Sequence, residues 1–377
     1  MKKNICFVTT TRAEFGLLKP LVNLIKDSEK YNLTLIVSGT HLSEEFGNTY
    51  IEIENNYDIL KINIMDKSNK HANAINNIMS NVFNNFYSEL DKINKQNKID
   101  MLVLLGDRFE ILAITQVAFI LGIKICHLAG GDITKGAMDD QFRNAISQLS
   151  DYHMPFSEDS KNNLLKMNIY NKNIFTLGNP GLEIFKDFNP KYSKNDIIKK
   201  YNLLENYILC VFHPETKNNT NYVELFFNQV KEFLKETEQS RYYSLLILKT
   251  NCDPGYVQII DTVLNMNKEF NNIVLIDNLE RSDYLTIAYY SDFYIGNSSS
   301  GLYELPYLNI PIINIGNRQE GRQLSSNIIQ SDYNNIKDNM VHVNENMKDI
   351  ITNIKQAYPI YDSKNIFIKS LDTIFFN

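Results

Sequence analysis

Long apolar runs are absent from this chain, and so are the cysteine patterns that build disulfide frameworks or zinc sites. Its four cysteines, Cys6, Cys126, Cys210 and Cys252, are widely separated and form no CxxC pair. Three of them lie in apolar stretches, where a free thiol behaves as a small hydrophobe. No stretch approaches the roughly 20 apolar residues of a membrane-spanning helix, and the apolar run near the N-terminus is too short for a signal peptide. We therefore expect a cytoplasmic protein in a reducing compartment, with no membrane partner.

A strong charge of either sign is also missing. The 38 basic and 44 acidic side chains give a net charge of -6. A mildly acidic chain argues against a nucleic-acid partner or an anionic membrane surface. It leaves room for a local basic pocket that binds one phosphorylated ligand. The G-x-G-x-x-G fingerprint and the G-x-x-x-x-G-K-[ST] loop are both absent, which disfavours a nicotinamide-dependent dehydrogenase and a P-loop enzyme.

Short apolar runs alternate with longer amphipathic segments, which is typical of a doubly wound α/β fold with a parallel sheet. In the first half, the predicted strands are Asn4–Thr9, Leu33–Ser38, Met101–Leu105, Lys124–Leu128 and Ile174–Leu177. The predicted helices between them are Phe15–Asp27, Ala74–Ile93, Phe109–Leu121 and Asp139–Leu149. A second series follows, with strands Tyr207–Phe212, Ser244–Lys249, Asn272–Ile276, Phe293–Ile295 and Pro311–Ile315, and a last helix at Glu345–Ala357.

The length of 377 residues and a hydrophobic fraction of 44% suit two domains, each with its own core. The polar stretch Lys186–Lys200 contains Pro190 and is predicted to connect them. We therefore expect a Rossmann-like lobe at residues 1–185 and a second one at 186–377. The tail Tyr358–Asn377 is a segment that can fold back onto the first lobe. Ligands of such sheets bind at the carboxyl ends of the strands, so two lobes in tandem predict a shared cleft.

Acidic and basic side chains follow two neighbouring predicted strands of the first lobe. Asp107 and Arg108 come after MLVLL, and Asp132 comes after KICHL and a pair of glycines. Asp139 and Arg143 open the next helix. The structural alternatives are a helix cap at Asp107 and a plain i,i+4 ion pair between Asp139 and Arg143. Three carboxylates on adjacent loops favour general acid and base chemistry.

The first strand is followed by TTTRAEFG, in which Arg12 and Glu14 stand at a helix start. An arginine there can supply a planar, multi-donor contact to an anion. The plainer alternative is a helix capped by Thr10 or Thr11, with Glu14 facing the helix dipole.

Polar clusters also follow the strands of the second lobe. His213 stands directly at a strand end, and Asn251 and Asp253 follow the strand SLLILK. The run Gly296-Asn297-Ser298-Ser299-Ser300-Gly301 opens a helix after a strand, which suits a diphosphate. Glu304 lies one turn further on and can reach a ribose diol. A serine-rich linker is the alternative, and the regular strand–helix series disfavours it.

With these loops in order, the chain resembles the hydrolysing UDP-N-acetylglucosamine 2-epimerases of the bacterial sialic-acid branch, and also the epimerase half of the bifunctional animal enzyme. The segments that carry the resemblance are TTTRAEFGLLKP, SGTHLSEEFGNTY, LGDRFE, HLAGGDITKGAMDDQFRNAISQLS, VFHPET, NCDPG, GNSSSGLYELP and NIGNRQEGR. They span residues 8 to 322, which is nearly the whole chain.

The resemblance implies a GT-B-like pair of lobes that binds a UDP-sugar, with no metal and no cofactor, in a homodimer or homotetramer. The implied reaction is anti elimination of UDP to a 2-acetamidoglucal, then syn addition of water, which releases N-acetylmannosamine for surface polysaccharides. The implied catalytic residues are Asp107, Asp132, Asp139, Arg143 and His213. The implied nucleotide and substrate contacts are Arg12, Ala13, Glu14, Arg108, Asn251, Asp253, Ser298, Ser299, Ser300, Gly301, Glu304 and Arg318.

This chain departs from the family pattern at three positions. Many relatives carry glutamate at the position of Ala129, and others carry it after the two glycines, where this chain has Asp132. Relatives have histidine at the position of Asn144. We expect Asp132 to take the role of the missing carboxylate.

Three other interpretations of the same residues stay open. The segments THLSEEFG and GGDITKGA also resemble enzymes that act on UDP-2,4-diacetamido-2,4,6-trideoxyglucose, in the legionaminic-acid branch. A GT-B glycosyltransferase would use the same fold but would need an acceptor. A nucleotide-sugar sensor would bind the ligand without turning it over.

Overall fold

The computed structural model describes residues 2–65, 74–215, 221–237, 242–250, 253 and 255–376. It divides into two compact units. Unit 1 comprises Met1–Ile133, Asp139–Glu183 and Ile360–Asn377, and unit 2 comprises Thr134–Met138 and Ile184–Pro359. The sequence placed the boundary after residue 185. In the structure the last residues return to unit 1, and one short segment inside the first half belongs to unit 2.

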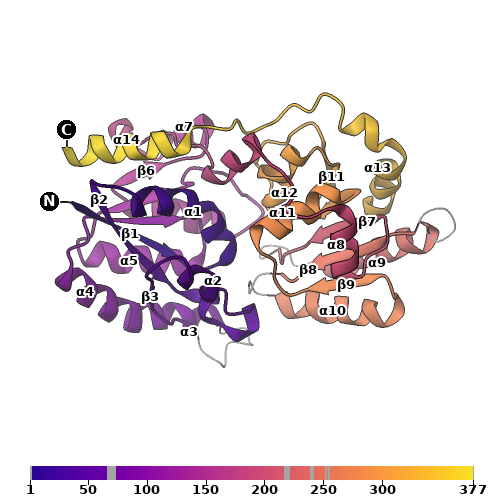
Figure 1. Cartoon of the computed structure of the whole chain (residues 1–377), viewed down its shortest axis with the longest axis horizontal. Coiled ribbons are helices and arrows are strands. Elements are labelled where there is room, and N and C mark those ends of the chain that lie inside the picture. Colours follow the sequence, from indigo (N-terminus) through magenta and orange to yellow (C-terminus); the bar gives the residue numbers. More distant parts are fainter. Residues whose placement is uncertain are drawn as a thin grey trace. The chain divides into compact units, whose positions relative to one another are not determined.

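Within its described residues, unit 1 contains one six-stranded parallel sheet in the order β3-β2-β1-β4-β5-β6 (Figure 1). Its strands are β1 (Lys3–Thr9), β2 (Tyr31–Val37), β3 (Leu60–Lys61), β4 (Met101–Leu105), β5 (Ile125–Leu128) and β6 (Tyr152–Met154). The central strands are continuous in Ile, Val, Leu and Phe because helices cover both of their faces. Successive side chains point to opposite faces, so Phe7 joins one hydrophobic cluster and Val8 joins the other.

The helices of unit 1 connect these strands or follow the last of them. They are α1 (Arg12–Lys26), α2 (Tyr50–Glu54), α3 (Ala74–Asn81), the π-helix η3 (Val82–Phe86), α4 (Tyr87–Gln96), α5 (Phe109–Ile120), α6 (Asp139–Leu149), α7 (Glu158–Lys166) and α14 (Ser363–Phe376). Short 3-10 helices add η1 (Gly39–Leu42), η2 (Glu44–Phe46) and η4 (Asn171–Asn173), and η5 (Pro180–Lys186) runs from unit 1 into unit 2.

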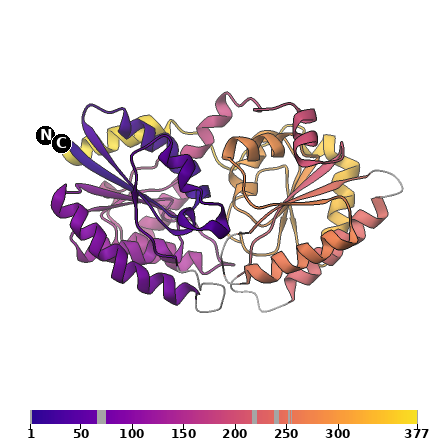
Figure 2. The ribbon, with the colours of Figure 1, turned by 60° about the horizontal axis from the view of Figure 1, so that its bottom comes forward.

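The C-terminal helix α14 completes the core of unit 1. Phe367 and Leu371 are fully buried in the cluster that also contains residues of β1 and α1, and the rings of Phe7 and Phe367 are 6.1 Å apart. Asp372 accepts hydrogen bonds from Lys30 (2.6 Å) and from the Tyr31 hydroxyl (2.7 Å). Both chain ends therefore lie at the same side of unit 1 (Figures 1 and 2). Residues far apart in sequence share one core here.

Unit 2 repeats the architecture. Within its described residues, its parallel sheet has the order β12-β11-β10-β7-β8-β9, with strands β7 (Tyr207–Val211), β8 (Ser244–Leu248), β9 (Ile273–Ile276), β10 (Phe293–Gly296), β11 (Ile312–Ile315) and β12 (Ile328–Ser331). Its helices are α8 (Lys194–Tyr201), α9 (Tyr222–Thr237), α10 (Tyr256–Glu269), α11 (Arg281–Tyr290), α12 (Ser300–Tyr303), the 3-10 helix η6 (Leu305–Leu308) and α13 (Ile336–Ile350). Two hydrophobic clusters again cover the two faces of the sheet.

Three sequence expectations were wrong in detail. Residues 174–177 form only one isolated bridge, from Ile174 to His153, and the sixth strand is the earlier β6. The predicted helix Ala74–Ile93 is interrupted by the π-helical turn η3. The last helix before the tail is α13, which begins at Ile336 and ends at Ile350, because Met340 and Val343 contribute to the core while residues after 350 are turn and coil.

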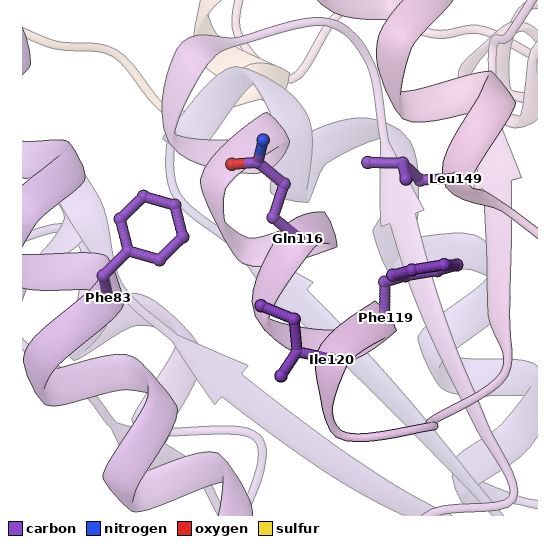
Figure 3. A pocket seen from close by; sticks show the side chains of 5 residues that line it. All are labelled: Phe83, Gln116, Phe119, Ile120 and Leu149. Carbon is purple, nitrogen blue, oxygen red and sulfur yellow. The ribbon is translucent and has the colours of Figure 1, made fainter.

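An apolar patch lies on the outside of unit 1. Figure 3 shows Phe119 and Ile120 at the end of α5, together with Phe83, Gln116 and Leu149, lining a shallow pocket. Ile120 is 66% exposed, Phe119 58% and Phe83 42%. Contiguous exposed apolar surface of this kind marks contact sites more often than isolated exposed side chains do.

In the described part of the chain no helix is long and apolar enough to cross a membrane.

Candidate active site

The loop after β4 is held in place by a buried histidine. The Nε2 atom of His127 lies 2.7 Å from the Gly106 carbonyl oxygen, and its Nδ1 atom lies 3.0 Å from the Ser147 hydroxyl. Burial lowers the pKa of His127 to about 4, so the ring is neutral near pH 7. A carbonyl only accepts, so Nε2 donates to Gly106 and Nδ1 accepts from Ser147. This fixes the turn at Gly106, whose φ is +89°, and thereby the position of Asp107.

Arg143 of α6 gathers the polar groups of this loop. Its side chain is 1% exposed and forms an ion pair with Asp107. It also donates to the Asp132 carbonyl oxygen (2.8 Å) and contacts Asp140 at 3.5 Å. The planar guanidinium suits such a convergence, because its five N–H groups point in fixed directions. The structure therefore brings the predicted residues Asp107, Asp132 and Arg143 together, and adds Asp140 to them. Asp139 stands beside this cluster as the first residue of α6.

The loop after β5 is tightly folded against unit 1 itself. A β-carbon on Gly131 would lie 2.1 Å from the Ser160 carbonyl oxygen, and one on Gly130 would lie 2.8 Å from the Ser147 hydroxyl. The close approach that the paired glycines permit is thus to other parts of the protein. Asp132 accepts a hydrogen bond of 2.5 Å from the Ser160 hydroxyl. Ala129 has a φ of +63°, a left-handed conformation that is uncommon for a residue with a β-carbon.

The helix start after β1 forms a complete cap. The Thr11 side chain accepts from the Glu14 amide, and Glu14 accepts from the amides of Thr10 (2.8 Å) and Thr11 (3.2 Å). Burial, with the nearby Glu110 carboxylate as the next cause, raises the pKa of Glu14 to about 7. Glu14 therefore caps the helix, as the structural alternative predicted. Its contact with a substrate stays a prediction.

The other predicted residues of unit 1 have internal partners or are exposed. Arg12 forms an ion pair with Glu52, and Ala13 is exposed. Arg108 donates from Nε to Glu110 Oε1 at 2.5 Å. The Thr10 hydroxyl donates to Glu14 and Glu110, and so links the β1 loop to the β4 loop.

Asn297 is the corresponding buried hub of unit 2. It follows β10, is fully buried, and pairs with the backbone of His213 through both halves of its amide. The His213 amide donates to Asn297 Oδ1 (2.7 Å), and Asn297 Nδ2 donates to the His213 carbonyl (2.9 Å). Arg318 (3.3 Å) and Gln319 (2.8 Å) donate to the Asn297 carbonyl oxygen. Asn297 therefore ties the ends of β7 and β10 to the turn after β11.

His213 and Arg318 are both anchored at this edge of the sheet. His213 is 7% exposed, and its Nδ1 atom lies 2.9 Å from the Thr250 hydroxyl at the end of β8. Arg318 also faces Asp253, with 3.9 Å between Nη2 and Oδ2. The structure thus brings together the predicted residues His213, Asp253 and Arg318. Asn251 lies outside the described residues.

The serine loop is ordered by tyrosines beneath it. The Ser298 amide donates to the Tyr294 hydroxyl (3.3 Å), and the Tyr284 and Ser300 hydroxyls are 2.7 Å apart. A β-carbon on Gly301 would lie 2.7 Å from the Tyr294 ring, so only glycine fits there. Ser299 precedes the short helix α12 without a side-chain capping hydrogen bond, and Glu304, at the end of this helix, pairs with Arg281.

The segment Thr134–Met138 joins this part of unit 2. The Lys135 amide donates to the Glu320 carbonyl oxygen at 3.0 Å. A β-carbon on Gly136 would lie 1.8 Å from the Asn317 carbonyl oxygen, so this contact requires glycine. Asp132 and Asp139 of unit 1 flank the segment.

Sequence reasoning missed several residues that organise both clusters. His127, Ser147 and Asp140 support the Asp107 loop, and Asn297 and Gln319 support the His213 loop. For His127, Asp140, Asn297 and Gln319 the sequence signal was their position in or next to a recognised motif, whereas Ser147 lies near the end of α6 and gave no such signal. Their inward direction was not visible from residue type alone.

Comparison with known proteins identifies the family of the chain. Residues 23–372 match the family model described as UDP-N-acetylglucosamine 2-epimerase. The chain belongs to this family. A relative from Campylobacter jejuni, the GDP/UDP-N,N'-diacetylbacillosamine 2-epimerase (hydrolyzing), is 35% identical over 338 residues, covering 89% of this chain and 86% of the relative. The polysialic acid biosynthesis protein P7 of Escherichia coli is 31% identical, covering 87% of this chain and 82% of the relative.

A solved structure supports the fold assignment. The UDP-GlcNAc 2-epimerase of Neisseria meningitidis, crystallised with bound UDP-GlcNAc, superposes with a TM-score of 0.81 at 18% identity, covering 98% of this chain and all of that one. The two Rossmann-like units of this family member therefore have the GT-B-like fold that the sequence predicted.

Proposed function

We propose that this family member is a hydrolysing 2-epimerase of a UDP-2-acetamido sugar. The observation that carries the proposal is the Asp107 carboxylate, which a buried Arg143 and a neutral His127 hold at the carboxyl edge of the unit 1 sheet. Preorganised groups of this kind contribute most where charge and protons move in the transition state. The relatives with hydrolysing activity in their names support the same reaction class.

The reaction has two balanced steps. A base takes the proton at C2, the C1–O bond breaks, and UDP leaves with the electron pair, which produces a 2-acetamidoglucal. Water then adds across the double bond, with its oxygen at C1 and a proton at C2 on the manno face. We assign proton transfer to Asp107 and Asp139, with Asp132 in the place of the glutamate of other relatives. Arg143 orients Asp107 and offsets its charge.

The unit 2 cluster is assigned to the nucleotide. His213 holds Nδ1 against Thr250, and we propose that Nε2 acts at the departing diphosphate. The proposed diphosphate contacts are Ser298, Ser299, Ser300, Gly301 and Arg318, and Glu304 is proposed to bind the ribose. Asn251 and Asp253 belong to the same proposal, as do Arg12, Ala13, Glu14 and Arg108 of unit 1.

Two sugars fit the proposal. The first sequence expectation was UDP-GlcNAc, for sialic acid. The 35% identical relative is named for N,N'-diacetylbacillosamine, which is 2,4-diacetamido-2,4,6-trideoxyglucose. This supports UDP-N,N'-diacetylbacillosamine, and the segments THLSEEFG and GGDITKGA favour the same substrate. We therefore place this sugar first and UDP-GlcNAc second.

Proton NMR of the reaction in deuterium oxide tests the proposal with each UDP-sugar separately. We expect release of UDP without any acceptor and a free manno-configured sugar that carries deuterium at C2. The ratio of kcat/KM for the two sugars decides between them. If UDP is released only when a sugar acceptor is added, the protein is a glycosyltransferase. If neither UDP-sugar is consumed although UDP binds, it is a sensor.

We also propose that the protein is a homo-oligomer that uses the apolar patch of α5. The patch exposes Phe119 and Ile120 on a helix whose other side is buried. Phe119→Lys would place a charge in the interface, so we expect a smaller particle in size-exclusion chromatography with light scattering. The control is Tyr170→Lys, which changes an exposed aromatic residue immediately before η4. A monomeric wild type, or an unchanged mass for Phe119→Lys, would contradict this proposal.

A further inference from the structure

The two oxygens of the Glu304 carboxylate have different surroundings. Oε1 accepts two hydrogen bonds from Arg281, from Nη2 at 2.6 Å and from Nε at 3.1 Å. Among the residues that the structure describes, Oε2 accepts no hydrogen bond. The side chain is 13% exposed, so Glu304 is largely enclosed and yet retains one oxygen that can accept. The ion pair therefore selects one orientation of the carboxylate.

Helix α11 supports the serine loop at two points. Arg281 is its first residue and pairs with Glu304, while Tyr284, one turn later, contacts the Ser300 hydroxyl at 2.7 Å. The first turn of α11 is itself anchored, because Asp283 accepts from Lys191 and Lys200, each at 2.9 Å. A helix fixed in this way can hold Glu304 and Ser300 at a constant separation.

The Arg281–Glu304 ion pair also changes the electrostatic potential beside the serine loop. A carboxylate beside a loop that receives a diphosphate repels the ligand, and the repulsion is strong where solvent is largely excluded. The Arg281 guanidinium offsets the charge of Glu304 without occupying its second oxygen. A lysine could offset the charge, but it lacks the planar fork that orients the carboxylate.

We propose that Arg281 is a positioning residue of the nucleotide site. It holds Glu304 with Oε2 available to a ribose hydroxyl and offsets its charge beside the Ser298–Gly301 loop. The inference rests on the proposed function, because it takes this loop and Glu304 as the site of the nucleoside diphosphate. Arg281 itself does not contact the reacting atoms, so it acts on binding and not on the chemical step.

Binding of UDP and of 2′,3′-dideoxy-UDP, measured by calorimetry, tests this inference. We expect the wild type to prefer UDP and Arg281→Met to lose about tenfold of that preference, the equivalent of one hydrogen bond to a charged group. Arg281→Lys should keep part of the preference. The KM for the UDP-sugar should rise in Arg281→Met while kcat changes little, since a contact made equally in the ground and transition states affects KM alone.

Matched variants separate a positioning role from a loss of folding. Lys191→Met removes one of the two lysines that bind Asp283 and leaves Lys200 in place, so α11 stays anchored and the variant should keep the preference for UDP. On a Glu304→Gln background, Arg281→Met should change the preference little. Should Arg281→Met fail to fold, the partial preference of Arg281→Lys carries the test.

The outcomes distinguish the two levels of the proposal. A wild type that binds UDP and prefers it, with the same preference in Arg281→Met within about twofold, overturns the role of Arg281 alone. A wild type that binds no UDP overturns the proposed function, and the inference with it. An equal loss in Lys191→Met would reduce Arg281 to a general support of α11.

Discussion

In each unit a fully buried polar side chain binds several groups of the strand-end loops, and these two side chains differ in charge. In unit 1 it is Arg143, which pairs with Asp107 and Asp140 and also binds the carbonyl of Asp132. In unit 2 it is Asn297, whose amide pairs with the backbone of His213. Arg143 thus binds mainly carboxylates, whereas Asn297 binds backbone amide and carbonyl groups.

The difference follows from what each loop is proposed to do. A cluster of carboxylates that moves protons would repel itself without a cation at its centre, and a buried cation needs several acceptors in return. A loop that receives a diphosphate can take its positive potential from groups that contact the ligand directly. A neutral amide can order two strand ends there and leave the positive potential to Arg318 and to backbone N–H groups. The two hubs thus predict separate effects on turnover and on nucleotide binding.

The largest expected effect comes from Asp107→Asn, which tests the unit 1 side of the comparison. The amide keeps the shape but cannot accept a proton, so turnover should fall by about 10³-fold or more. UDP affinity should stay within about twofold, because the nucleotide contacts are assigned to other residues. Steady-state kinetics and calorimetry on the same preparation measure both quantities.

Asp100→Asn is the matched control for Asp107→Asn. Asp100 precedes β4, whereas Asp107 follows it, and Asp100 binds Lys3 and the Asn4 amide at the opposite edge of the sheet. This variant should keep its turnover. Normal turnover in Asp107→Asn would remove the carboxylate cluster from the mechanism, and an equal loss in both variants would point to folding.

Asn297→Ala tests the unit 2 side, with a smaller expected effect. Its loss removes two hydrogen bonds to the buried backbone of His213, which should lower the free energy of unfolding by about 2–4 kcal/mol. UDP affinity should fall by about tenfold or more, because the serine loop and His213 lose their common anchor. Calorimetry and thermal unfolding, with and without UDP, follow the two effects.

Asn314→Ala distinguishes lost stability from lost organisation of the site. Asn314 is also a buried asparagine of the unit 2 sheet, but its amide donates to the side chain of Gln330 (2.7 Å) and not to a loop at the site. We expect this variant to be less stable and to bind UDP nearly as the wild type does. Equal UDP affinities for the two variants would show that Asn297 is not a hub.

The sequence predicted the fold and the position of the loops well, because both depend on patterns. Continuous apolar runs such as Met101–Leu105, in a series that alternates with helices, are typical of buried parallel strands, and the observed β4 has these same bounds. Short or exposed segments could not be assigned from their apolar pattern in this way. Leu60–Lys61 is two residues long and exposed, and Ile174–Leu177 is apolar enough for a strand although it forms only one bridge.

Side-chain direction was the part that sequence could not supply. Glu14 and Arg108 stand at strand ends in a motif that suggests ligands, yet Glu14 closes a capping box and Arg108 pairs with Glu110. Asn297 lies inside a motif that was recognised, and its role as a hub depends on a contact with His213, 84 residues earlier. Long-range contacts of this kind arise from packing and have no local pattern.

The smallest expected difference between the units is in how their stability changes at acid pH. Burial lowers the pKa of His41 to about 3, and the charge of Arg12 adds to the effect. A folded-state pKa below the ordinary 6.5 means that the neutral ring stabilises the fold above pH 6.5, and that this stability is lost as the pH falls. By about pH 4.5 the loss reaches up to about 2–3 kcal/mol.

His41→Gln isolates this contribution. Glu14 changes stability in the opposite direction, since its raised pKa favours the fold at acid pH, so the difference between variant and wild type is the quantity to measure. Hydrogen exchange of unit 1 amides at pH 6.5 and at about pH 4.5 should show a smaller decrease in protection for His41→Gln. His342→Gln, which changes an exposed histidine of α13 in unit 2, should behave as the wild type. If the pH dependence of unit 1 stability is the same in all three proteins, protonation of His41 does not cause the loss of stability at acid pH. The hydroxyls of Thr9 and Thr49 would then stabilise the charged ring as well as the neutral one.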